Sequence, residues 1–215
     1  MIRYDRQRRH FAVALAAMAG FVDAVGFLSA NGYFVSFMSG NTTRLGVALG
    51  TSLRDAMVPA LLIFGFVCGV TLGALVSMRA GSRRKIAVLA LVGILLATAA
   101  GARMLGLAGP MMAALVLAMG ALNNTFQRDG DVAVGLTYMT GALVRLGLGL
   151  ARRIAGQPGG AAALSWALLW AGLLAGAVLG AFLQDRLPMG CLWIATAWAT
   201  LMIGVAARLP PEPQL

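Results

Sequence analysis

Long uncharged stretches alternate along the chain with short segments that carry nearly all of its charge. A helix needs roughly 20 apolar residues to cross a hydrocarbon core about 30 Å thick. Six stretches reach or approach this length, which predicts an all-α polytopic membrane protein with six transmembrane helices. These stretches are residues 11–30, 58–78, 86–102, 111–127, 161–183 and 189–207.

The composition supports this interpretation. Of the 215 residues, 60% are hydrophobic and 11% are charged, whereas soluble domains carry roughly 25% charged residues. The mean hydropathy is +0.85. Together these values exclude a soluble globule and make the lipid bilayer the first expected partner.

The net charge of +10 reflects topology rather than nucleic-acid binding, because the basic residues lie between the apolar stretches. With a cytoplasmic N-terminus, twelve basic residues fall inside and three outside, which is the bias expected for membrane proteins. Both termini are then cytoplasmic. The inside set is Arg3, Arg6, Arg8, Arg9, Arg79, Arg83, Arg84, Lys85, Arg128, Arg152, Arg153 and Arg208; the outside set is Arg54, Arg103 and Arg186.

An internal repeat is visible at an offset of 101 residues. Residues 35–50 and 136–151 are identical at six of sixteen positions. We therefore expect one membrane domain over 1–215 with a first repeat at 11–107, a second at 108–208 and a disordered tail at 209–215.

Each repeat holds three predicted spans, so the second copy enters the membrane from the opposite side and the repeat is inverted, in a 3+3 arrangement. Glycines at spacing four occur at equivalent places in both halves, and small residues at that spacing allow close helix contact. The two sets are Gly65, Gly69 and Gly73, and Gly172, Gly176 and Gly180.

The repeated motifs are too short and polar to span the bilayer, and we expect each to form a re-entrant half-helix of about ten residues, roughly 15 Å long. Residues 39–43 should line something polar, with Ser39 or Asn41 as the N-cap. If the helix N-termini meet near the midplane, their dipoles together with Arg44 and Arg145 favour an anion.

Asp23 interrupts the first span, where a charge costs roughly 2.5 to 3.5 kcal/mol on insertion scales. Its counterpart at the same offset is Asn124. The expected partner of Asp23 is Arg44 or Arg145. Two interpretations stay open: an ion pair that fixes the half-helix, or a carboxylate that couples to a proton or ion.

Catalytic and metal chemistry find little support in the sequence. There is one histidine, His10, and no cluster with metal-ligand spacing. The segment 129–131 resembles a fragment of a calcium loop but lacks the remaining ligands. Ser39 and Cys68 have no base near them in sequence. We therefore expect no enzyme activity, no metal and no cofactor.

Residues 20–24 (GFVDA), residues 37–42 (FMSGNT) and the following Gly46 resemble the signature of the YoaK family, bacterial inner-membrane proteins that carry a domain of unknown function. The resemblance covers the whole chain and implies a multi-pass protein of the bacterial inner membrane. The second copy departs from the motif, with Ala142 and Leu143 at the positions of Asn41 and Thr42. The two halves are therefore not functionally equivalent.

We expect a small-solute transporter or channel, for an anion or a small metabolite, with its site at the repeat interface. The alternative is a non-transporting membrane subunit or scaffold that uses its glycine-rich helix faces to contact a partner. The size of the bundle is compatible with a homodimer. The residues expected at the site are Asp23, Ser39, Gly40, Asn41, Thr42, Arg44, Asn124, Thr140, Gly141 and Arg145.

Overall fold

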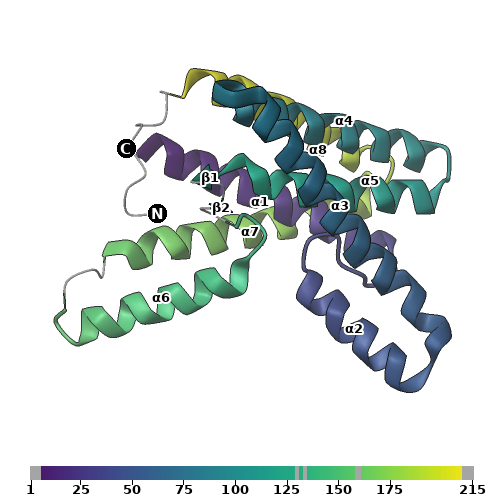
Figure 1. The fold of residues 1–215 in the computed structure, drawn as a ribbon, viewed down its shortest axis with the longest axis horizontal. Coiled ribbons are helices and arrows are strands. Elements are labelled where there is room, and N and C mark those ends of the chain that lie inside the picture. Colours follow the sequence, from purple (N-terminus) through teal and green to yellow (C-terminus); the bar gives the residue numbers. More distant parts are fainter. Residues whose placement is uncertain (1–5, 129–130, 133–134, 158–160, 210–215) are drawn as a thin grey trace.

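The computed structural model describes residues 6–128, 131–132, 135–157 and 161–209. Over these residues the protein is helical, apart from its loops and a pair of two-residue antiparallel strands (Figure 1). The elements are α1 (Arg6–Ser29), α2 (Met38–Thr51), η1 (Leu53–Ala56), α3 (Met57–Ala80), η2 (Gly81–Arg83), α4 (Arg84–Met104), α5 (Ala108–Leu122), η3 (Asn123–Thr125), β1 (Gln127–Arg128), β2 (Asp131–Val132), α6 (Met139–Ile154), α7 (Ala161–Arg186) and α8 (Cys191–Arg208).

Four segments of the described chain are long and apolar enough to cross a membrane: Arg6–Ser29, Leu53–Met104, Ala163–Arg186 and Cys191–Arg208. The second is 52 residues long and contains both α3 and α4, separated by the short 3-10 helix η2. A membrane-spanning, all-helical protein is therefore confirmed. The predicted count of six spans is not, because α5 has only 15 residues.

Helix α5 begins earlier than the sequence predicts. We expected a start behind Pro110, but the helix runs from Ala108 to Leu122 and holds Pro110 in its first turn. A proline there is tolerated because the N–H groups of a first helical turn have no partner within the helix. The C-terminal part of the predicted span forms η3 and the first strand instead.

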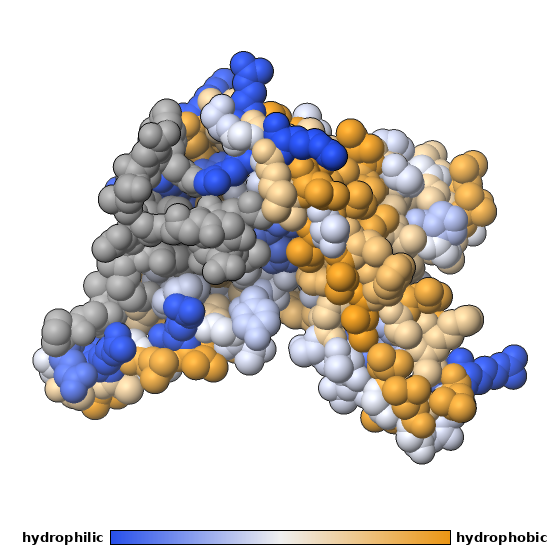
Figure 2. Space-filling view, in the orientation of Figure 1, coloured by the Kyte–Doolittle hydropathy of each residue, from blue (hydrophilic) through white to orange (hydrophobic). Residues whose placement is uncertain are grey.

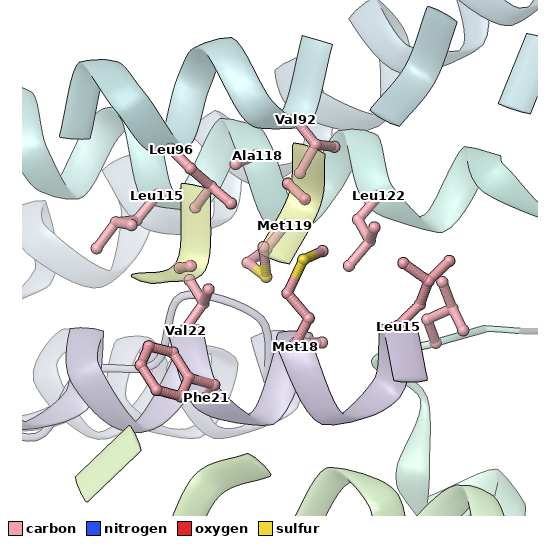
Figure 3. Close-up of a cluster of buried hydrophobic side chains, with 14 of the residues drawn as sticks. Leu15, Met18, Phe21, Val22, Val92, Leu96, Leu115, Ala118, Met119 and Leu122 are labelled. Carbon is pink, nitrogen blue, oxygen red and sulfur yellow. The ribbon is translucent and has the colours of Figure 1, made fainter. Parts of the chain in front are cut away.

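Helix α1 is the central element of the fold. Its side chains Leu15, Met18 and Phe21 are fully buried and belong to one buried cluster with Leu96 of α4 and Met119 of α5 (Figure 3). Helices α5, α7 and α8 all contact α1, and α4 packs on both α5 and α8. In this view α1 and α5 run in opposite directions along the long axis, as do α4 and α8 (Figure 1).

The predicted glycine faces are buried inside the chain. Gly172, Gly176 and Gly180 on α7 lie against the backbone of α1 at Val13, Ala17 and Phe21. The scaffold alternative would need a glycine face open to a partner protein, and α1 occupies the space beside this set.

The glycines of α3 behave in the same way. A Cβ at Gly73 would lie 2.7 Å from the Asn124 side-chain nitrogen, and one at Gly69 would collide with the Leu117 carbonyl. Leu117 lies within α5, and Asn124 lies just beyond its end, in η3. Each glycine set thus permits one close helix contact, α7 with α1 or α3 with α5.

Large apolar side chains face outward, as lipid contact requires. Leu61, Phe64 and Val67 on α3 are exposed, as are Val178 and Phe182 on α7. Figure 2 shows orange, hydrophobic residues gathered on the half of the molecule away from the start of α1. In water such patches would promote association, so these faces fit a hydrocarbon environment.

Two short helices extend from the central body. Helix α2 has 14 residues and packs on α3, whereas α6 has 16 residues and packs on α7. Each begins beside the central helices and ends away from them (Figure 1). The short helices that the repeated motifs predict are therefore present. They are longer than the expected ten residues or so, and α2 does not pack against α6.

Substituting Gly176 with alanine tests the close contact between α7 and α1. The added Cβ would collide with the Ala17 carbonyl oxygen, and overpacking of this kind costs about 1–3 kcal/mol. We expect a lower midpoint of thermal unfolding in detergent. Gly204→Ala on α8 is the matched control because nothing lies within 4 Å of its new Cβ. Equal midpoints for the two variants would contradict close packing of α7 on α1 at Gly176.

Candidate functional site

Asp23 lies in the buried part of α1, and its carboxylate holds the loop that leads into α2. The side chain is 4% exposed. Its Oδ1 accepts hydrogen bonds from the backbone N–H groups of Val35 and Ser36, at 2.9 and 2.8 Å. Hydrogen bonds from N–H groups to a carboxylate are stronger than those between neutral groups. Asp23 therefore fixes the loop to the middle of the protein.

We expected Arg44 or Arg145 as the partner of Asp23, but both side chains lie over aromatic rings instead. The Arg44 guanidinium lies over the Tyr33 ring, 4.8 Å from its centroid. The Arg145 guanidinium lies over the Trp166 ring at 4.9 Å. Cation–π contacts of this kind contribute about 0.5–1 kcal/mol at exposed sites. Within the described chain, backbone amides rather than an arginine thus accompany the Asp23 carboxylate.

Ser36 contributes a second buried polar group beside Asp23. Its side chain is 4% exposed, and its hydroxyl has no hydrogen-bond partner among the described residues. The backbone N–H of the same residue bonds to the Asp23 carboxylate. Buried hydroxyls are normally hydrogen-bonded, so this group has capacity left for a water, a proton or a ligand.

Asn41 holds the same loop from the other side. It is fully buried, and its side chain forms two hydrogen bonds with the backbone of Phe34: Nδ2 donates to the carbonyl at 2.7 Å, and Oδ1 accepts from the N–H at 3.1 Å. The prediction of Ser39 or Asn41 as N-cap is therefore wrong. The N-cap is Phe37, without a side-chain bond, because Asn41 bonds to the loop and Ser39 is exposed.

The remaining residues of the first motif face outward or pack locally. The hydroxyl of Thr42 donates to the Met38 carbonyl of its own helix at 2.8 Å and is exposed. Gly40 lies against the Phe34 ring, where a Cβ would come within 2.8 Å of ring carbons. These residues shape the start of α2 and leave polar groups on its surface.

In the second half, two neighbouring asparagines form the polar contacts. Asn124 is buried and donates from Nδ2 to the Val70 carbonyl of α3 at 3.0 Å. The Oδ1 of Asn123 accepts a hydrogen bond from the Thr137 hydroxyl at 3.2 Å, in the loop before α6. Asn123 and Thr137 were not among the expected site residues, although Thr137 stands at the repeat offset from Ser36.

The second motif is more open than the first. Thr140 and Arg145 are exposed, and Gly141 lies against the Tyr138 ring, where a Cβ would come within 2.9 Å. The exposed Arg145 contrasts with the half-buried Arg44. The two motifs are thus similar in sequence but differ in how far they are covered.

The structure brings some of the expected site residues together and leaves others apart. Asp23 and Asn41 hold opposite sides of one loop. Asn124 instead joins α5 to α3. Among the described residues no group of three or more His, Cys, Asp or Glu side chains is placed to hold a metal ion. Residues 129–130, in the calcium-like fragment, and 210–215, in the expected tail, lie outside the described residues.

A shallow groove on the outer face of α7 differs in kind from these polar contacts. It contains none of the expected site residues. Its walls are apolar, which suits a lipid chain better than a polar solute. The lining residues are Ala171, Leu174, Ala175, Val178, Leu179 and Phe182.

Apolar outward faces, long hydrophobic helices and buried polar contacts at the loops together define a multi-pass helical membrane protein. A family model described as protein of unknown function (DUF1275) matches residues 11–205. The chain therefore belongs to this family, and the resemblance to YoaK proteins is confirmed.

Two curated relatives are similar to the chain. The UPF0700 transmembrane protein RA0705 of Rhizobium meliloti (strain 1021) is 39% identical over 153 residues, which cover 68% of this chain and 65% of the relative. The UPF0700 transmembrane protein YoaK of Bacillus subtilis (strain 168) is 39% identical over 62 residues, or 28% of each chain. The matched regions thus span less than two thirds of each relative. No solved structure matches the chain.

Replacing Asn41 with alanine tests whether its amide holds the loop. The change removes both hydrogen bonds to Phe34 and leaves its backbone N–H and carbonyl unpaired, at about 1–3 kcal/mol for each buried group. We expect a lower thermal midpoint and faster amide exchange across residues 33–37. Thr43→Ala is the control, because that hydroxyl is exposed and bonds only to its own helix. Unchanged exchange in the Asn41 variant would show that the loop is held by other contacts.

Proposed function

We propose that this protein is a small-solute membrane transporter or channel, with selectivity for an anion, built from two inverted repeats. The observation that carries the proposal is a pair of arginines at equivalent positions of the two short helices. Arg44 and Arg145 each lie over an aromatic ring, and neither forms an ion pair within the described chain. Arginine at membrane depth is costly and marks solute or ion paths.

The helix contacts support two inverted repeats, α1–α4 and α5–α8. Helix α1 packs on α7, and α5 packs on α3, so the first helix of each half contacts the third helix of the other. Each contact has its own set of glycines on the third helix. The opposite directions of α1 and α5 (Figure 1) agree with an axis of symmetry in the membrane plane.

The placement of α2 and α6 supports a solute path between the halves. Both helices begin near the central body (Figure 1), and helix N-termini favour anions through their dipoles and free N–H groups. Figure 2 shows an open notch between the α2–α3 and α6–α7 hairpins, with white to pale blue residues on part of its edge. A polar surface at this depth suits water or a solute better than lipid.

We propose that the protein lies in the bacterial inner membrane with both termini cytoplasmic; its two relatives are named as transmembrane proteins. Helix α1 begins and helix α8 ends at the same end of the molecule (Figure 1). Hydrophilic residues gather on that half of the surface in Figure 2. A basic end of this kind faces the cytoplasm in membrane proteins.

Single cysteines at the outer ends of the two hairpins test the inverted repeat. Ser52 follows α2, and Gln157 lies beyond the end of α6. In a background with Cys68→Ala and Cys191→Ala, we expect Gln157→Cys to react with a membrane-impermeant maleimide only from the cytoplasmic side. Ser52→Cys should react only from the outside. Labelling of both from one side would contradict the inverted arrangement.

Anion-dependent thermal stabilisation tests the proposed function. The purified protein in detergent is heated with sodium salts of chloride, nitrate, phosphate, acetate and succinate, and with gluconate at equal ionic strength as reference. A bound anion must stabilise the folded protein, by about 2.7 kcal/mol at a hundred times Kd. We expect at least one anion to raise the midpoint, and Arg44→Gln to abolish the effect.

Arg54→Gln, which changes an exposed arginine outside the motifs, is the matched control and should keep the stabilisation. An anion that stabilises both variants equally would place its site elsewhere. Stabilisation by none of the anions, with both variants folded, would favour the alternative of a non-transporting membrane subunit.

A further inference from the structure

The first half of the chain uses a charged residue where the second half does the same work without charge. In the first half, the Asp23 carboxylate accepts N–H bonds from the loop before α2. In the second half, Asn124 stands at the repeat position of Asp23, and the neighbouring Asn123 amide accepts a bond from Thr137 in the loop before α6. The contact in the second half thus uses an uncharged amide oxygen and a side-chain hydroxyl in place of a carboxylate and backbone N–H groups. The carboxylate contributes something that an amide does not.

That contribution is a negative charge without a counter-ion in the described structure. Helix α5, which touches α1, has no charged residue. The charged residues of α7 are Asp185 and Arg186 in its last turn, and α8 has Arg208 at its end. On α2 the charged residue is Arg44, whose guanidinium lies over Tyr33. The two N–H donors offset part of the cost of burying the carboxylate, and a bound proton turns it into a neutral carboxyl group, whose burial costs less.

The Ser36 hydroxyl gives a proton a place to pass. It belongs to the residue whose backbone N–H bonds to the Asp23 carboxylate, is buried, and has no hydrogen-bond partner among the described residues. A hydroxyl both donates and accepts, so it can relay a proton to or from Asp23 when a water reaches it. Thr137, at the equivalent position of the second half, uses its hydroxyl on Asn123 instead.

We propose that the Asp23 carboxyl group binds and releases a proton that accompanies solute movement through this protein. This inference rests on the proposed transport function. The proton comes from water on one side, adds to one carboxylate oxygen and leaves to water on the other side. With the proton bound, the N–H bonds from Val35 and Ser36 change from charge-assisted to neutral bonds, which are roughly half as strong. The loop before α2 is then held less tightly.

Infrared difference spectroscopy of the full chain tests the proton site directly. The protein is labelled with ¹³C at the aspartate carboxyl carbon and titrated over the pH range in which it stays folded. We expect the band of a protonated buried carboxyl to appear as the pH falls and to be absent from Asp23→Asn, which keeps an acceptor oxygen. Asp55→Asn is the matched control because Asp55 is exposed, and it should keep the band.

Amide hydrogen exchange across residues 33–37 reports the loop. After correction for the intrinsic pH dependence of exchange, the natural protein should exchange faster in the protonated state, and Asp23→Asn should show no such pH effect. If Asp23→Asn does not fold, Ser36→Ala serves in its place, since it keeps the carboxylate and should shift the midpoint of the infrared titration. A carboxyl that stays in one protonation state throughout, or an Asn variant with the same pH-dependent exchange, would overturn the proposal.

The two proposals fail in different ways. An anion that stabilises the protein while Asp23 does not titrate would leave transport standing and exclude the proton site. A titrating Asp23 in a protein that none of the tested anions stabilises would support the proton site and contradict anion transport.

Discussion

Close backbone contact between α7 and α1, and between α3 and α5, is the constraint on which the rest of this structure depends. In a bilayer no difference in hydrophobicity drives helices together, so packing must come from close approach. Glycines supply it here, because any side chain at Gly176 or Gly69 would meet a carbonyl oxygen of the facing helix. The pairing of first and third helices across the halves follows from these contacts. The positions of α2 and α6 follow from it too, because each packs on a third helix.

Backbone groups at the breaks between helices impose the second requirement. A loop within the hydrocarbon region must have its N–H and carbonyl groups satisfied by protein or water. Asp23 and Asn41 do this for the loop before α2, and Asn123 contributes before α6. Buried polar residues are therefore concentrated where the chain leaves a helix. Their role in holding the loops explains why a chain with so few polar residues places several of them in its interior.

Much of the fold can be predicted from the sequence, because apolar length and glycine spacing report directly on helices and their contacts. The short helices at the repeated motifs were also predictable, since 35–50 and 136–151 are too polar to span. The partners of the polar residues were not. Charge pairing suggested an arginine for Asp23, whereas the observed donors are backbone N–H groups of Val35 and Ser36. Backbone amides are present at every residue, so no sequence pattern singles them out.

The two halves differ in the chemistry of their buried polar positions. Asn41 and Ala142 occupy the same repeat position and are both buried, so the packing site was kept while its chemistry changed. The amide at Asn41 bonds to the loop backbone, and a methyl group in its place cannot. Similarly, a carboxylate at Asp23 corresponds to an amide at Asn124. The proposed transport and proton coupling use this difference, because the carboxylate contact belongs to the first half and holds the loop before α2.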